Sequence, residues 1–169
     1  MAEGDSCAKY QGCRNSGPDW ILEGNLAWTQ SGLTDFPSWR ISCSGAGSNL
    51  TPSIGNVGVP SLSTTYSVTL ADARPNTFAI CVSGLSDSVY GGGALPAPLP
   101  GAPGCSLLAS PDVLQLFSTN AAGAASAPFS IPANPANIGV SLYHQWAVID
   151  NVNALGVVVS DAGRATVDN

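Results

Sequence analysis

Charged side chains are scarce in this chain. Only 9% of its residues are Asp, Glu, Lys or Arg, whereas an average soluble domain has about 25%. The five Lys and Arg residues stand singly and the formal net charge is −6, so the sequence has no basic stripe that could neutralise phosphates. We therefore expect no nucleic-acid partner and no attraction to an anionic membrane surface.

Long apolar runs are also missing. Gly, Pro, Ser or Asn interrupts every hydrophobic stretch before it reaches the roughly 18–20 residues that a spanning helix needs, so we expect no membrane insertion. The first six residues lack the basic and apolar regions of a signal peptide. We expect either that a leader has been removed or that the chain is a piece of a longer protein.

Histidine occurs once, and no pair of cysteines has Cys-x-x-Cys spacing. Both facts disfavour a structural zinc site, which needs four Cys or His ligands at recognisable spacing, and no cofactor is expected. Disulfides are the better interpretation of the five cysteines, and they indicate an oxidising location, extracellular or at the cell surface.

The cysteine environments predict two disulfides. Cys43 and Cys81 lie in apolar strand patterns of similar register, so we expect them to pair. Cys13 and Cys105 lie in loops that have no other anchor, and we expect a second bond between them. Cys7 is then left free or takes the place of Cys13.

Small, polar and turn-forming residues are abundant, which favours an all-β fold. The chain has 19 Gly and 13 Pro, and its 44% hydrophobic residues fall into short β-branched or aromatic runs. We predict an antiparallel β-sandwich of about eight or nine strands with long Gly/Pro loops, in one domain over 21–169 on which a Cys-bearing segment over 1–20 packs. The strand candidates are 24–30, 38–44, 64–71, 77–84, 112–118, 124–131, 139–149, 155–160 and 163–168.

Several segments carry more specific predictions. The run 66–70 and the run 78–82 alternate apolar and polar residues, and the turn-rich link between them is typical of a hairpin. The segment 91–104 holds five Gly and four Pro, so it is expected to be an ordered loop crossing one end of the sandwich. Residues 110–112 can begin either a short helix or a strand. The predicted core is Val68, Leu70, Phe78, Ile80, Leu114, Leu116, Phe129, Leu142, Trp146, Val148 and Val158.

The order of several short phrases resembles a module repeated in secreted and surface proteins of planctomycetes and related bacteria. The phrases are Tyr10-Gln-Gly-Cys13, Tyr66-Ser-Val-Thr-Leu70, the Pro-rich run ending at Cys105, and Leu142-Tyr-His-Gln-Trp-Ala-Val-Ile-Asp150. The resemblance covers roughly residues 10–167 and implies an extracellular β domain with no enzymatic activity. The chain departs from that pattern around 40–60 and by its cysteines at positions 43 and 81.

Candidate catalytic and metal sites are weak. His144 would have to serve any Ser-His-Asp arrangement, but its place in an apolar strand pattern favours a structural histidine bonded to the backbone or a carboxylate. The carboxylates lie mostly in predicted loops, where solvated turn formers are the rule, so we expect no enzyme. Oxygen ligands for calcium are offered by Asp150, Asn151, Asn153 and Asp161, although their spacing matches no EF-hand and turn formation explains them as well.

Three functions follow from this chemistry. The first is a non-catalytic extracellular module for surface attachment or structural assembly, whose partner is a cell-surface or matrix polymer and whose working surface lies in 44–62 or 85–104. The second is a carbohydrate-binding module that stacks sugars on exposed Trp20, Trp28 and Trp39. The third is a subunit of a filament or shell that associates with copies of itself, which an unpaired strand edge or flat apolar face would favour.

Overall fold

A computed structural model describes residues 38–39 and 51–169, all of which belong to one compact unit, Thr34–Asn169. The regular secondary structure of the described chain is antiparallel β-sheet apart from one 3-10 turn, η2 (Pro135–Asn137). The predicted all-β class is therefore confirmed. The predicted division between 1–20 and 21–169 lies outside the described residues.

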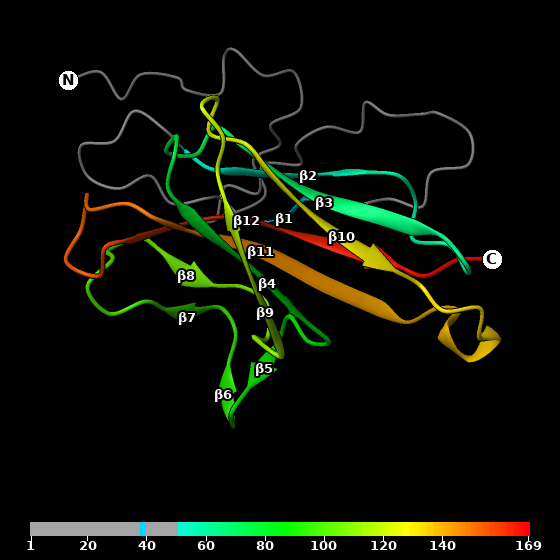
Figure 1. Ribbon diagram of the computed structural model, residues 1–169. Coiled ribbons are helices and arrows are strands. Elements are labelled where there is room, and N and C mark those ends of the chain that lie inside the picture. Colours follow the sequence, from blue (N-terminus) through cyan, green and yellow to red (C-terminus); the bar gives the residue numbers. More distant parts are fainter. Residues whose placement is uncertain (1–37, 40–50) are drawn as a thin grey trace, which may run out of the picture. The chain divides into compact units, whose positions relative to one another are not determined.

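Two sheets contain the long strands (Figure 1). One has five strands in the order β1 (Ser38–Trp39), β12 (Val157–Thr166), β11 (Ser141–Ile149), β4 (Phe78–Gly84) and β9 (Val113–Ser118). The other has the order β10 (Ala125–Ser130), β3 (Thr65–Ala71) and β2 (Ser53–Val57). Two small hairpins are formed by β5 (Val89–Tyr90) with β6 (Gly93–Ala94), and by β7 (Ala97–Pro98) with β8 (Ser106–Leu107).

Alternating strands were well predicted, and irregular ones were not. The predictions over 64–71, 77–84, 112–118, 124–131 and 139–149 each match one observed strand. The predictions 155–160 and 163–168 are wrong in one respect, because β12 runs unbroken through Gly163. Strand β2 lies in the stretch 44–62, which we predicted to be poor in strand structure. Its Gly55 and Asn56 give no strand signal, and the strand is formed by pairing with β3. No helix begins at 110–112.

The predicted hairpin between 66–70 and 78–82 is wrong. Strand β3 pairs with β2 and β10, whereas β4 pairs with β11 and β9, so the link between β3 and β4 passes from one sheet to the other. A second sheet-to-sheet link, between β9 and β10, runs beside it: Ala73 N donates to Gly123 O at 3.1 Å and Asn76 N donates to Asn120 O at 3.2 Å. A Cβ atom on Gly123 would overlap the Ala73 carbonyl oxygen, so this close approach needs glycine.

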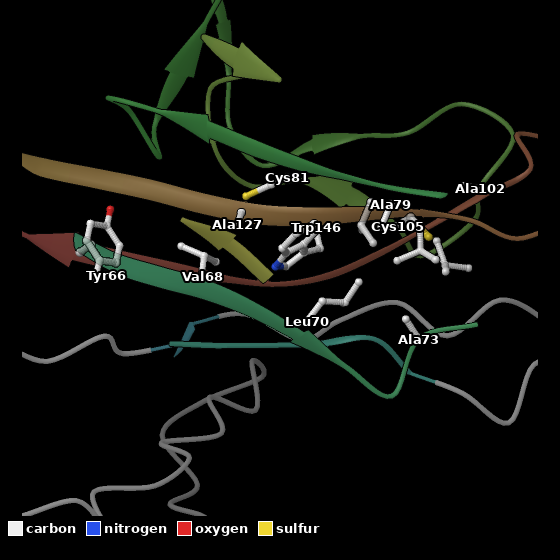
Figure 2. Close-up of a cluster of buried hydrophobic side chains, with 14 of the residues drawn as sticks. Tyr66, Val68, Leu70, Ala73, Ala79, Cys81, Ala102, Cys105, Ala127 and Trp146 are labelled. Atoms are coloured by element: carbon white, nitrogen blue, oxygen red, sulfur yellow. The ribbon is translucent and has the colours of Figure 1, made fainter. Parts of the chain in front are cut away.

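One core contains buried side chains from both sheets. Figure 2 shows Val68 and Leu70 of β3 on one side of Trp146, a β11 residue, with Cys81 and Ala79 of β4 nearby. Trp146 is fully buried, its Nε1 donates to Thr69 O at 3.2 Å, and its ring meets that of Phe117 edge-on with centroids 5.6 Å apart. Small residues on β4 leave room for this indole.

The predicted core is right for five residues and wrong for three. Val68, Leu70, Trp146, Val148 and Val158 are buried, and Ile80, Phe129 and Leu142 are half-buried. Phe78, Leu114 and Leu116 are exposed, because they lie on the outer face of the five-stranded sheet. Alternation shows which residues share a face, but not which face is buried. The prediction placed the larger side chains of β4 on the buried face, and the structure places them on the outer face.

A β-bulge in β12 connects the two sheets. Between the pairs Gln145–Ala162 and Ala147–Val159 the register shifts, so that Ser160 and Asp161 together oppose Trp146. Trp146 N donates to Ser160 Oγ at 2.9 Å, and Ile54 N of β2 donates to Asp161 Oδ1 at 2.9 Å. The extra residue thus turns a carboxylate toward the other sheet.

The Gly/Pro-rich segment 91–104 is ordered, and the residues that follow it pack on a sheet face. Gln145, buried on the outer face of β11, accepts from Leu108 N at 2.9 Å and donates to Ser106 O at 3.0 Å. Leu155, in the turn between β11 and β12, donates its N–H to Gly101 O at 3.0 Å. The segment therefore contacts the turn at one end of β11, and residues 106–108 cover part of the outer face of β11.

Candidate functional site

The only histidine of the chain sits inside the protein. His144 is fully buried on β11, and its Nε2 lies 2.8 Å from the hydroxyl of Tyr66. Its Nδ1 lies 2.8 Å from Ser83 Oγ, which is 3.8 Å from the sulfur of Cys81. The ring of Phe129 packs on the imidazole with centroids 4.6 Å apart. A polar chain therefore crosses the core from β3 through β11 to β4.

One arrangement of protons fits this series of hydrogen-bonded side chains. Burial, with a smaller contribution from Cys81, raises the pKa of Tyr66, so its hydroxyl keeps its proton and can donate it to His144 Nε2. The proton of the neutral ring is then on Nδ1 and is donated to Ser83 Oγ. In this arrangement the Ser83 hydroxyl can donate its own proton to the Cys81 sulfur, 3.8 Å away. Each polar group is satisfied by this single direction.

Burial also sets the charge states of the side chains in this hydrogen-bonded series. It lowers the pKa of His144 to about 4, so the imidazole is neutral at pH 7. Burial raises the pKa of the Cys81 thiol to about 12, against the opposing hydrogen bond from Ser83. A base or nucleophile must contact its substrate, and these side chains are sealed in the core. His144 is a structural residue, and its partners are hydroxyls where we had expected the backbone or a carboxylate.

The predicted Cys43–Cys81 disulfide is wrong. Cys81 is a free, buried thiol on the inner face of β4, beside Ser83 and across the ladder from Trp146. An apolar strand pattern suits a buried free cysteine as well as a bonded one. Cys105 is disulfide-bonded. The partner predicted for it, Cys13, lies outside the described residues, as do Cys7 and Cys43, so that pairing stays a prediction.

The four candidate calcium ligands do not come together. Asp150 forms an ion pair with Arg74 at 3.5 Å, Asn153 closes its own turn with Val157, and Asp161 accepts from Ile54 N. Asp161 lies four residues along β12 from Val157, about 13 Å from the turn that holds the others. Asn151 is exposed. Within residues 38–39 and 51–169, no group of three or more His, Cys, Asp or Glu side chains could hold a metal ion.

The tryptophans proposed for sugar stacking are not tested by the structure. Trp20 and Trp28 lie outside the described residues. The backbone of Trp39 belongs to β1, where it pairs with Ala162 of β12. An aromatic residue that the structure does describe, Tyr90, is exposed.

We define the hairpin surface as the exposed side chains Leu85, Val89, Tyr90 and Val113, which lie where β4 ends and β9 begins. The β5–β6 hairpin projects there from the body of the domain, at the bottom of Figure 1. An open hollow of about 520 Å³ lies against it, lined by Ser86, Val89, Tyr90, Gly91, Gly92, Ser110 and Asp112. The lining combines an aromatic ring, a carboxylate and bare backbone.

Local hydrogen bonds hold the hairpin surface in place. Asp112 Oδ2 accepts from Leu85 N at 2.9 Å and from Ser110 Oγ at 2.8 Å, while Ser86 Oγ accepts from Val89 N at 3.1 Å. The two-residue loop Gly91-Gly92 has φ angles of 58° and 82°, which suit the tight turn that matches strand twist. The surface is therefore pre-shaped for contact.

The stretch 85–104 was predicted to be a working surface because it is poor in strand signal, and the exposed hairpin lies within it. Sequence reasoning did not single out Tyr90 or Asp112. The signal that could have done so is the run Tyr90-Gly-Gly-Gly93, where a short turn presents an aromatic side chain.

No family model matches the chain, and neither does any curated protein or solved structure. None of the helices in the described residues is long and apolar enough to cross a membrane.

Proposed function

We propose that this domain is a non-catalytic extracellular module that attaches to a neutral polysaccharide of the cell surface or matrix through its hairpin surface. The observation that carries the proposal is the exposed ring of Tyr90 beside the Asp112 carboxylate in an open hollow. A pyranose has one apolar C–H face that stacks on such a ring and hydroxyls that donate to a carboxylate.

The charge of the chain supports a neutral polymer. With a net charge of −6, an acidic polysaccharide would be repelled over the whole surface, whereas a neutral one meets no such barrier. The open shape of the hollow suits a chain that passes across it. Binding here needs no acid, base or metal.

The burial of His144 supports the non-catalytic part of the proposal. Its imidazole is the one side chain whose ordinary pKa suits proton transfer near pH 7, and it is committed to Tyr66 and Ser83 within the core. The bonded Cys105 supports an oxidising, extracellular location. We further propose that the two sheets form a β-sandwich, since side chains of β3 and β11 share one core.

Adsorption to insoluble neutral polysaccharides, cellulose and chitin, tests the function. We expect the full chain to be retained on one of them and Tyr90→Ala to bind about tenfold more weakly, because one stacked aromatic ring contributes more than 1 kcal/mol. Phe78→Ala is the matched control: Phe78 is 56% exposed and Tyr90 48%, but Phe78 does not line the hollow.

An equal loss of binding in both variants would show that nonspecific hydrophobic adsorption, and not the hairpin surface, causes retention. Absence of binding to either polymer would contradict the choice of ligand. Turnover of a sugar or ester substrate by the intact chain would contradict the non-catalytic assignment.

A further inference from the structure

Strand β9 forms an edge of the five-stranded sheet, with β4 as its neighbour. Thr119 N donates to Thr77 O at 2.8 Å, which makes that pair a hydrogen-bonded one, and hydrogen-bonded pairs alternate along an antiparallel ladder. Leu114 and Leu116 therefore occupy the non-hydrogen-bonded positions opposite β4. Their backbone N–H and C=O groups point away from the sheet, and no group in the described part of the chain pairs with them.

The edges of the three-stranded sheet carry protection that β9 lacks. Strand β10 contains Pro128, which has no N–H to offer, and Ile54 N of β2 is taken by the Asp161 carboxylate. Residues 113–118 include no Pro and no charge. Leu114 and Leu116 are instead 61% and 66% exposed on the outer face of β9. An edge of this kind is a template for another strand.

Gln115 adds an independent observation at the middle of the same strand. Its side chain lies on the face of β9 opposite to Leu114 and Leu116. Its Oε1 is buried without a hydrogen-bond partner, the one such side-chain atom among the described residues. A buried amide oxygen left unpaired costs about 1–3 kcal/mol, so a partner that brings a donor here is favoured.

We propose that two copies of this chain pair antiparallel through β9 about a two-fold axis at Gln115, which joins their five-stranded sheets into one. In this register Leu114 hydrogen-bonds through its backbone to Leu116 of the second copy, and the two pairs of leucines pack on one face. Gln115 lies opposite Gln115 of the second copy at a non-hydrogen-bonded position, where side chains are closest.

A second copy fits this edge for reasons of symmetry. A two-fold axis perpendicular to the sheet places the outer faces of both copies on the same side. The leucines of one copy therefore contact the leucines of the other, and Gln115 contacts Gln115. Once each Gln115 amide turns from its buried position toward the edge, its Nε2 can donate to the Oε1 of the other. The nearest charge, on Asp112, lies opposite Ser118 of the second copy and not opposite itself, so the pairing meets no direct repulsion despite the net charge of −6.

Sedimentation equilibrium on the full chain tests the association. A six-residue strand makes a small interface, so we expect the mass to rise from 17.0 kDa to twice that value only at concentrations on the order of 100 µM. Leu116→Glu should remain monomeric, because two buried carboxylates would face the leucines. Val57→Glu is the matched control, since Val57 is also 66% exposed but lies on β2, and it should dimerise like the wild type.

Cross-linking tests the register without depending on affinity. Cys81 lies opposite position 115 on β4, so the test uses a Cys81→Ser parent. In that parent Gln115→Cys should give a covalent dimer above the background, because position 115 of one copy faces position 115 of the other, and Leu114→Cys should not. Circular dichroism would confirm that each variant is folded. A wild-type chain that stays monomeric, a Leu116→Glu variant that still dimerises, or cross-linking at position 114 instead of 115 would each overturn the proposal. None of these measurements involves a polysaccharide, so failure here leaves the attachment function to its own test.

Discussion

Acid should destabilise this domain through His144 in a way that a single substitution can isolate. In the folded state burial lowers the pKa of the imidazole from 6.5 to about 4. Between these values the unfolded chain binds a proton that the folded chain does not, so the free energy of unfolding falls as the pH falls. The contribution of His144 is fully present above pH 6.5 and is lost by about pH 4.

The size of the loss follows from the pKa difference. Each pKa unit corresponds to 1.36 kcal/mol, so the full loss is about 3 kcal/mol, with about 1 kcal/mol lost at pH 5.5 and about 2 to 3 kcal/mol at pH 4.5. For a domain whose total stability is about 5–15 kcal/mol, this is a large share.

Urea unfolding at pH 7.5, 5.5 and 4.5 measures the effect in the wild type and in His144→Gln. The carboxylates titrate in both proteins, so the difference between the two pH profiles belongs to residue 144. We expect the variant to be less stable at pH 7.5 and to approach the wild type by about 2 to 3 kcal/mol at pH 4.5. Parallel profiles would refute the reasoning, because they would mean that His144 gains its proton without cost in the folded state.

Two further outcomes are expected from the core. Trp146→Ala should lower the free energy of unfolding by about 3–5 kcal/mol in urea titration, and Trp146→Phe by clearly less; an unchanged midpoint for the Ala variant would mean that the indole is not buried. Cys81 should resist iodoacetamide in the native protein and react only on unfolding, since its thiol is buried and its pKa is raised to about 12. Rapid native labelling at Cys81, detected by peptide mass, would contradict this.

Local patterns predicted the long strands because the alternation of apolar and polar residues depends only on neighbouring positions in the sequence. Strand β3 alternates Tyr66, Val68 and Leu70 with polar residues, and all three are buried. Strand β2 carries Gly55 and Asn56 and exists only because β3 lies beside it, so no local signal could reveal it. Of the candidate site, sequence indicated the stretch 85–104, but not that the Tyr90 ring and the Asp112 carboxylate line one hollow.

The sequence by itself determined the all-β class and which residues of a strand share a face, since composition and a period of two depend on the chain alone. Tertiary structure decided which face is inside. On β4 the small residues Ala79 and Cys81 face the core, because the indole of Trp146 fills the space opposite them. The same choice sends Leu114 and Leu116 outward on β9. Which face of a strand is buried depends on how side chains from distant parts of the sequence fill the core together.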